Sequence, residues 1–185
     1  RGALWLHCLN SAIASRRIAE LAKSQVNPGV AYTAGLLHDI GKALISVHLR
    51  DRSADLGRMM AANDTADFIQ TENRILGTNH TEVGELLGRH WRLPESLCMA
   101  IRHHHAPSQA PEANRLLAYL VHLGDFVSMI SGGGTGSDAL QYPLDPDYVR
   151  YVTIERSALE ALLLQTCIEF TKSSAAMGGE SAVEG

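Results

Sequence analysis

Apolar residues recur along most of this sequence at the three- and four-residue spacing that marks one face of an α-helix. In residues 2–24 they fall near this spacing, and charged side chains fill much of the opposite side. Asn27-Pro28-Gly29 then interrupts the pattern, and Pro28 is well placed near the start of a second helix that runs into the pair His38-Asp39. The pattern predicts an all-α fold.

Later segments show the same periodicity and are separated by polar, glycine or proline residues. Helices are predicted over about 43–49, 65–76, 80–91, 94–105, 112–131 and 153–172. Gly77 suits the end of one helix, and Thr78 or Asn79 can cap the start of the next. We expect a helix or irregular connection at 51–64, a short loop at 107–111 and a flexible glycine-rich connection at 131–137. The predicted organisation is one helical domain over residues 1–172 and a disordered tail at 173–185.

The composition fits a single soluble globular domain. The 185 residues are 45% hydrophobic and 19% charged, and only 5% are aromatic, which favours helices over a sheet. The formal net charge of −4 argues against general nucleic-acid binding, because no domain-wide basic excess is present. No apolar run approaches the ~18 residues of a transmembrane helix. We therefore expect no membrane segment and no general nucleic-acid partner.

Cysteine usage and the first residue bear on the context of the chain. Cys8, Cys98 and Cys167 lie far apart within apolar segments, at spacings that do not suit a metal site. They are expected to be reduced core thiols of a cytoplasmic protein. The sequence begins at Arg1 in helical sequence, without a signal peptide or an initiating Met. We expect it to be a fragment of a longer protein.

The stretch 34–42 carries the most distinctive chemistry. Here an apolar run ends in the pair His38-Asp39, which is followed by Gly41 and Lys42. Adjacent residues on a helix point about 100° apart, so the pair can bind one ion only at a helix end or across a pocket. An imidazole beside a carboxylate suits a divalent transition metal, while Gly41 would admit a close ligand and Lys42 a phosphate. The alternative is a polar helix end with a chance His-Asp pair.

Other histidines and carboxylates also lie in, or at the end of, apolar predicted helices. They are His7, His80, His104, His105 and Asp125. Buried imidazoles and an unpaired buried carboxylate cost free energy unless a shared partner satisfies them. Each residue taken alone has a structural explanation. Taken together with His38-Asp39, they favour one metal cluster.

These residues resemble the HDOD branch, the HD-related output domains of bacterial signalling proteins, within the HD superfamily of metal-dependent phosphohydrolases. His7, then His38-Asp39, then Asp125 match the superfamily signature of a His, an adjacent His-Asp pair and a later Asp. The branch is matched further by Trp5-Leu6-His7, residues 34–42, Glu72 with Gly77 and His80, Glu82-Val83-Gly84, Leu86-Leu87, Trp91-Arg92-Leu93-Pro94, Ile101 and His104-His105-Ala106-Pro107. These motifs follow one another in order over residues 5–127.

The resemblance implies an HD-domain-like helical bundle with a central metal site. It implies one ion held by His7, His38 and Asp125, a second held by His80, His104 and His105, and Asp39 as the bridge between them. Two such ions, ~3.5–4 Å apart, would polarise a phosphoester and provide a hydroxide nucleophile. Lys42 would contact a phosphate oxygen, so Asp39 and Lys42 are the candidate catalytic residues. The mixed ligands point to iron or manganese, and zinc, cobalt or magnesium can also bind.

The sequence also departs from the superfamily pattern. The residues after His104-His105 are Ala106-Pro107-Ser108-Gln109, whereas cyclic-dinucleotide phosphodiesterases have an acidic residue and a Gly-Tyr-Pro motif there. A carboxylate that some relatives use for a third metal would fall at Ala3, so we expect no trinuclear centre.

Several residues near these motifs have alternative interpretations. A one-residue shift in the triple-histidine run would exchange His103 with His104. His122 is a candidate for a supporting hydrogen bond behind the metal ligands. Glu72 and Glu82 are expected to form helix caps or structural hydrogen bonds.

Two main hypotheses follow for function. One is a metal-dependent phosphohydrolase that acts on a nucleotide or another small phosphoester. The other is a non-catalytic regulatory module that binds a signalling protein or a small ligand and has a structural or vestigial metal site. In either case the resemblance implies a bacterial signalling context with an upstream sensor or receiver domain. A helical scaffold without metal is the third alternative.

Overall fold

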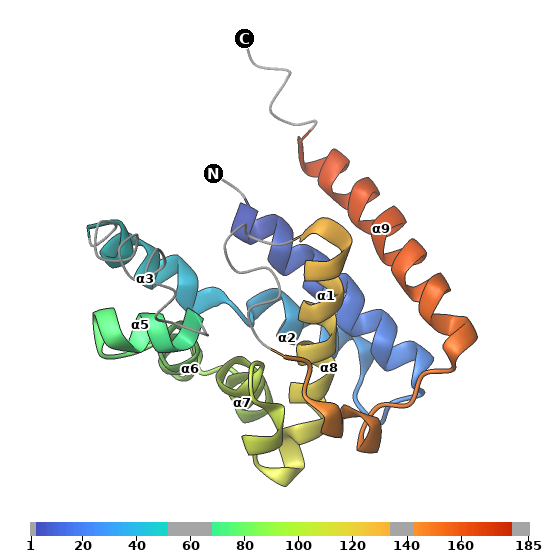
Figure 1. Cartoon of the computed structure of the whole chain (residues 1–185), viewed down its shortest axis with the longest axis horizontal. Coiled ribbons are helices and arrows are strands. Elements are labelled where there is room, and N and C mark those ends of the chain that lie inside the picture. The colour runs from blue at the N-terminus through green and yellow to red at the C-terminus, as the bar shows by residue number, and fades with distance from the viewer. Residues whose placement is uncertain (1–2, 52–67, 134–142, 179–185) are drawn as a thin grey trace.

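The computed structural model describes residues 3–51, 68–133 and 143–178 of the chain. Its α-helices are α1 (Ala3–Leu21), α2 (Pro28–Leu37), α3 (Ile40–Asp51), α5 (Phe68–Leu76), α6 (His80–His90), α7 (Glu95–His103), α8 (Glu112–Ser128) and α9 (Arg156–Gly178) (Figure 1). Short turns at Pro107–Gln109, Met129–Gly133 and Pro146–Arg150 complete the described elements. No strand occurs within these three ranges. The predicted all-α architecture is confirmed.

Three helix boundaries form where the sequence indicated them. The Asn27 side chain accepts a hydrogen bond from the Gly29 amide at 2.8 Å, and Pro28 occupies the first turn of α2. Gly77 ends α5 with φ of 73°, a conformation that costs glycine little. The Asn79 side chain accepts hydrogen bonds from the first-turn amides of α6 and so caps that helix.

The core is centred on α1, which packs against both α2 and α8 (Figure 1). Close packing depends on small residues at these contacts. A Cβ atom added to Gly124 of α8 would lie 2.1 Å from the Ser15 hydroxyl of α1, and one added to Gly35 of α2 would lie 2.9 Å from the Ala12 Cα. The three helices therefore approach closely enough for side chains from different helices to meet.

The second part of the molecule comprises α3, α5, α6 and α7. Helix α6 packs between α3 and α7, and α7 in turn packs on α8. Gly41, which the sequence suggested as a close approach to a ligand, instead abuts α6. A Cβ atom at this position would lie 1.9 Å from the His80 carbonyl oxygen. That expectation is corrected, because the absent side chain makes room for a neighbouring helix.

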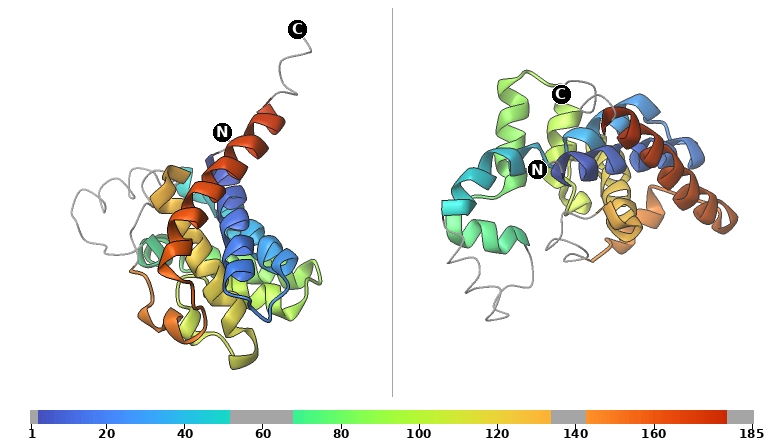
Figure 2. Two further views of the ribbon diagram at one scale, coloured as in Figure 1. Left: turned by 90° about the vertical axis from the view of Figure 1, so that its right-hand side faces the viewer. Right: turned by 90° about the horizontal axis from the view of Figure 1, so that it is seen from above.

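The C-terminal helix α9 lies on the outer side of α1 (Figure 2). Glu169 of α9 forms ion pairs with Arg16 and with Arg17 of α1, the second at 2.6 Å. Helix α9 continues to Gly178, beyond the end at residue 172 that its apolar pattern suggested. Residues 173–178 of the expected tail are therefore helical, while 179–185 lie outside the described residues.

Other expectations differ in detail from the structure. Helix α8 ends at Ser128, and its last predicted turn is replaced by the π-type turn Met129–Gly133. Cys8 and Cys98 are buried as expected, whereas Cys167 is exposed. Of the predicted connection at 51–64 only Asp51 is described, and residues 134–137 of the glycine-rich stretch also lie outside the described residues.

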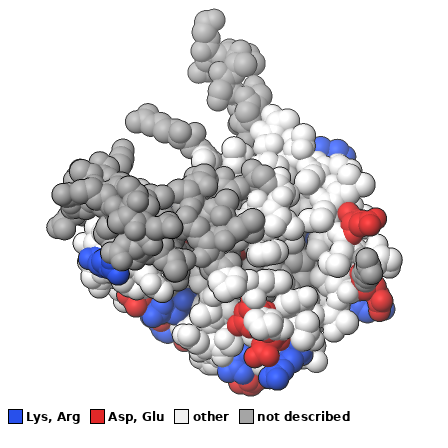
Figure 3. Space-filling view, in the orientation of Figure 1, with Lys and Arg blue, Asp and Glu red and all other residues white. Residues whose placement is uncertain are grey.

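Charged side chains on the described surface alternate in sign. In Figure 3, acidic and basic groups lie next to one another along the lower edge of the molecule. Arg89, for example, pairs with Glu85 and Glu95, and Arg102 pairs with Glu82. Within the described ranges, none of the helices is both long and apolar enough to cross a bilayer.

Candidate metal centre

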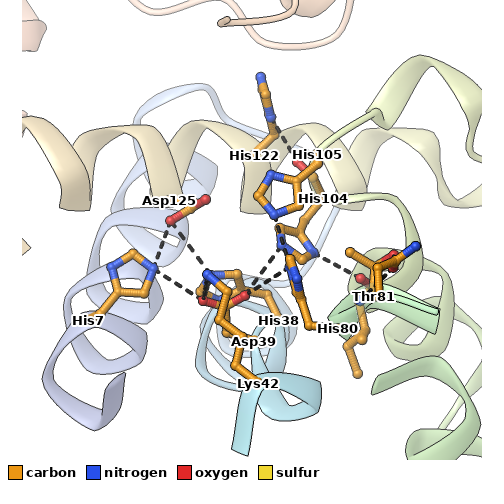
Figure 4. A network of polar contacts seen from close by, with 12 residues as sticks. His7, His38, Asp39, Lys42, His80, Thr81, His104, His105, His122 and Asp125 are labelled. Atoms are coloured by element: carbon orange, nitrogen blue, oxygen red, sulfur yellow. Dashed lines mark hydrogen bonds and ion pairs between the residues drawn. The ribbon is translucent and has the colours of Figure 1, made fainter. Parts of the chain in front are cut away.

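Five segments of the chain bring polar side chains to one buried point. His7 comes from α1, His38 and Asp39 from the junction of α2 and α3, His80 from the start of α6, His104 and His105 from the residues after α7, and Asp125 from α8 (Figure 4). His38, Asp39, His80 and His104 are 0% exposed. The seven side chains proposed from the sequence as metal ligands therefore meet in the core.

Asp39 lies at the centre of this cluster and faces two groups of imidazoles. Its Oδ2 is 3.6 Å from His7 Nε2 and 3.5 Å from His38 Nε2. Its Oδ1 is 3.4 Å from His80 Nε2 and 3.6 Å from His104 Nε2. The two oxygens of one carboxylate thus face opposite halves of the cluster (Figure 4).

Each half has its own potential ligand atoms. Asp39, His80, His104 and His105 form one group, and His7, His38 and Asp39 form another, with the ligand atoms of each group within 4.8 Å of one another. Asp125 adds a carboxylate to the second half, where its Oδ1 lies 2.9 Å from His7 Nε2 and 3.6 Å from His38 Nε2.

The tautomers of two central histidines direct a lone pair toward Asp39. His38 Nδ1 donates to the Gly35 carbonyl at 2.7 Å, and His104 Nδ1 donates to the Ile101 carbonyl at 2.8 Å. Their Nε2 atoms are therefore unprotonated when the rings are neutral. Both Nε2 atoms are buried and lack a hydrogen-bond partner among the described residues. A buried imidazole lone pair in this situation fits a metal ion.

Glu72 of α5 orients a third imidazole. Its Oε2 accepts hydrogen bonds from His80 Nδ1 at 2.6 Å and from the His80 backbone amide at 2.8 Å. A carboxylate behind a metal-binding histidine fixes the ring and increases its basicity. The sequence suggested a structural hydrogen bond for Glu72, but it gave no indication that the partner would be His80. Only the hydrogen bonds between Glu72 of α5 and His80 at the start of α6 reveal this role.

Electrostatic interactions set the charges of the cluster. Burial raises the pKa of Asp39, but the Lys42 ammonium and His38 outweigh burial and hold that pKa well below its usual range. Burial also raises the pKa of Asp125, but the neighbouring His38 and His7 imidazoles outweigh burial and hold the pKa of this carboxyl well below its usual value. Both carboxylates are therefore charged at neutral pH, as metal binding requires.

The surroundings move the pKa values of three cluster histidines in two directions. Burial lowers the pKa of His104 to about 4 and lowers the pKa of His105 well below its usual value. Burial also opposes protonation of His38, but Asp39 and Asp125 outweigh it and raise the pKa of His38. His104 and His105 are thus neutral near pH 7 and can serve as ligands without losing a proton.

Lys42 lies against the central carboxylate. Its Nζ is 2.9 Å from Asp39 Oδ2, and its side chain is 15% exposed. His105 is also only partly buried, and its Nε2 is 3.0 Å from His80 Nε2. Lys42 and His105 therefore mark the side of the cluster that is nearest to solvent.

The structure also resolves the alternatives left open around these residues. His104, and not His103, lies in the central cluster, because His103 is only partly buried at the end of α7. His122 contacts the backbone of His104 through Nδ1 at 2.8 Å. Glu82 lies apart from the cluster and bonds Thr78 and Arg102, as expected of a structural residue.

The donor set of five imidazoles and two carboxylates fits a divalent transition metal. Soft thiolates are absent from the described cluster, and imidazole suits zinc, iron, copper or nickel, while carboxylate suits manganese or magnesium. Several donors are buried and three sets of ligand atoms converge. The cluster could therefore hold a metal ion.

Comparisons with known proteins agree with this arrangement. A family model described as HDOD domain matches residues 1–107, which include the candidate ligands from His7 to His105. A solved structure of an HDOD domain protein of unknown function from Geobacter sulfurreducens is 26% identical, with a TM-score of 0.73. That match covers 92% of this chain and 60% of the Geobacter chain.

Two other solved structures share the fold at lower identity. One is the MmoQ response regulator of Methylococcus capsulatus strain Bath, which is 23% identical, with a TM-score of 0.63 over 88% of this chain and 61% of its own. The other is a protein of Shewanella amazonensis SB2B provisionally named a phosphohydrolase, which is 23% identical, with a TM-score of 0.66 over 91% of this chain and 62% of its own. The chain thus spans about three fifths of each of these proteins.

Proposed function

This chain belongs to the HDOD domain family, and from that premise we propose that it is a signalling module whose two-metal centre hydrolyses a nucleotide or another small phosphoester. We further propose that the centre binds two ions and that the protein acts in the bacterial cytoplasm. A cyclic dinucleotide is a poor candidate, because Ala106-Pro107 stands where the corresponding phosphodiesterases have another motif.

The division of Asp39 between two imidazole groups carries the proposal. Its Oδ2 faces His7 and His38, and its Oδ1 faces His80 and His104. A single-metal site has no need of a second group of inward lone pairs, which would be costly to bury. A carboxylate between two sets of nitrogen ligands is the arrangement expected of a bridge between two ions.

The assignment of ligands follows these two groups. His7, His38 and Asp125 would hold one ion, His80, His104 and His105 would hold the other, and Asp39 would bridge. Iron or manganese suits this mixed set best, and zinc, cobalt or magnesium can substitute. When bound, the ions would supply Lewis acidity toward a phosphoryl oxygen and an activated water.

Lys42 is the candidate residue for binding the substrate. It neutralises Asp39 at 2.9 Å, and it is partly exposed on the solvent side of the cluster. Once the charge of Asp39 is shared with bound cations, the ammonium is available for a phosphate oxygen. Lys42 would then bind the phosphoryl group and stabilise the charge that develops on it.

Hydrolysis of p-nitrophenyl phosphate and bis(p-nitrophenyl) phosphate with added Mn²⁺ tests this function. We predict turnover by the wild-type protein and its loss in His38→Ala and Asp39→Ala, which remove metal ligands. Lys42→Met should retain metal and lose about 100-fold in rate, as when a single charge-stabilising donor is removed. His90→Gln, at an exposed position, serves as the matched control. Absence of turnover in protein with both ions bound would contradict the catalytic proposal.

The second candidate is a regulatory module in which the metal centre is structural. It is favoured by membership of the HDOD family and by the likeness to a response regulator. In this case the partner would be a signalling protein or a small phosphorylated ligand, and the larger protein would contain a sensor or receiver domain. Metal binding without hydrolysis of any phosphoester would favour this function.

A further inference from the structure

A buried histidine behind the candidate metal centre connects it to a distant segment of the chain. His122 of α8 is 0% exposed and points away from Asp39 (Figure 4). Its Nδ1 is 2.8 Å from the His104 carbonyl oxygen, and its Nε2 is 3.0 Å from the Asp145 backbone nitrogen. Because the Asp145 amide must donate, Nε2 accepts and the proton lies on Nδ1. One neutral tautomer therefore satisfies both contacts.

We infer that His122 is a positioning residue that couples the metal centre to residues 143–152, so that metal binding stabilises this segment against local opening. The inference rests on the proposed function, because it assumes that His104 binds a metal ion. Neither the ring of His122 nor the segment is among the metal ligands. The connection consists of the His104 carbonyl, the His122 imidazole and the Asp145 amide.

His104 is well placed to transmit a change at the metal centre. Its Nε2 faces Asp39, its Nδ1 donates to Ile101, and its own carbonyl accepts from His122. A bound ion would constrain the ring, which is joined to the carbonyl of the same residue through Cβ and Cα. Buried hydrogen bonds depend steeply on distance and angle, and they are costly to break without a replacement. A constraint on His104 therefore also restricts His122 and the Asp145 amide.

The segment beyond Asp145 can carry such a constraint to the surface. The Asp145 side chain caps the turn Pro146–Arg150 by accepting from the Asp147 amide at 2.9 Å. On either side of this cap, Leu144 and Tyr148 line an apolar cavity of about 280 Å³, which Leu159 and Leu163 of α9 also line. The segment thus contacts His122 through the Asp145 amide and shares the lining of an apolar cavity with α9.

A matched pair of substitutions isolates the Asp145 amide. Asp145→Pro removes the N–H group, and the observed φ of −65° already suits proline. Asp145→Ala removes the same carboxylate cap but keeps the N–H group. Position 145 is partly exposed, so both variants should fold. Because both variants lose the carboxylate, a difference in their response to metal reports on the hydrogen bond from the Asp145 amide to His122.

The experiment is hydrogen exchange of residues 147–152 with and without saturating Mn²⁺, with the bound metal counted in each sample. In the wild-type protein and in Asp145→Ala, metal should slow exchange about tenfold, a typical coupling between two sites. In Asp145→Pro, metal should bind but leave exchange in this segment unchanged. By reciprocity, the metal affinity of Asp145→Pro should fall below that of Asp145→Ala by the same factor.

Each other outcome contradicts the inference in a distinguishable way. Metal bound without slower exchange in the wild-type protein would overturn the coupling and leave the proposed metal centre intact. An equal response in the two variants would show that the amide is not the connection, and loss of response in both would assign it to the carboxylate. Absence of bound metal in the wild-type protein would contradict the proposed function and, with it, this inference.

Discussion

At the scale of single residues, the carboxylate of Glu72 orients a candidate metal ligand, His80. It accepts both the ring N–H and the backbone N–H of His80, and it is 0% exposed. The two hydrogen bonds fix the direction of His80 Nε2, which faces Asp39. Glu72 therefore contributes to the centre without being one of its ligands.

Replacement of Glu72 by Gln should weaken metal binding while preserving the fold. The Gln oxygen can still accept a hydrogen bond, but without the negative charge the His80 ring should be a weaker donor to a metal ion. We predict a fall of about 10- to 100-fold in metal affinity, the usual effect of removing such a partner. Titration calorimetry with Mn²⁺ measures it. Glu82→Gln is the control, since the Glu82 carboxylate bonds Thr78 and Arg102 apart from the cluster. An equal loss in both variants would contradict this role.

The burial of His104 leads to a prediction for how the stability of the metal-free protein depends on pH. Burial lowers the pKa of His104 to about 4 in the folded state, against about 6.5 in the unfolded chain. A group with a lowered pKa contributes its full stability above the unfolded value and loses it as the pH falls through the folded value. In excess chelator, the urea midpoint should therefore decrease between pH 6.5 and about 4. His38, whose pKa is raised, acts in the opposite direction.

A matched pair of histidine variants separates this contribution from the general effect of acid. His104→Gln should show a smaller decrease in the urea midpoint than the wild-type protein over the same pH range. His90→Gln, at an exposed position, should show the full decrease. A midpoint that rises with falling pH, or an identical decrease in all three proteins, would be inconsistent with a buried neutral His104.

At the scale of the elements, the junction of α3 and α6 determines where His80 lies. Gly41 is the contact point, since a Cβ atom there would lie 1.9 Å from the His80 carbonyl oxygen and 2.8 Å from the Gly84 amide nitrogen. Both neighbours are backbone atoms that cannot rotate away. The helix that begins with His80 can approach Asp39 only because residue 41 lacks a side chain.

Gly41→Ala should therefore destabilise the protein severely, by about 3 kcal/mol or more, because the two helices must separate. Gly77→Ala should cost only about 1–2 kcal/mol, since a Cβ atom there meets nothing within 4 Å and only the positive φ is unfavourable. Urea unfolding of both variants gives the comparison. Equal losses would indicate that the contact of α3 with α6 is not tightly packed.

Helix positions were predictable where local chemistry determines them. Pro28, Gly77 and Asn79 act through their own backbone or through side-chain contacts two or three residues away, so the sequence alone indicates their roles. The end of α9 was not predictable in this way. Its last turns contain small and polar residues without an apolar stripe, yet they continue the helix to Gly178.

At the scale of the whole molecule, the sequence predicted the all-α fold, the family and the residues that converge. His7, His38-Asp39 and Asp125 are recognisable because residue type and order are visible along a chain. The supporting contacts were not predictable, because they join distant segments. Glu72 meets His80, and His122 meets Asp145, only after the helices pack. Whether the converging residues act as ligands remains a prediction.

Metal content of freshly purified protein, measured by elemental analysis beside His38→Ala, tests the central claim most directly. One oxygen of Asp39 faces His7 and His38, and the other faces His80 and His104. We therefore predict about two equivalents of iron or manganese per wild-type chain, and a loss of metal in the variant. No bound metal in the wild-type protein, even after reconstitution, would contradict the two-metal centre and leave a helical interaction module.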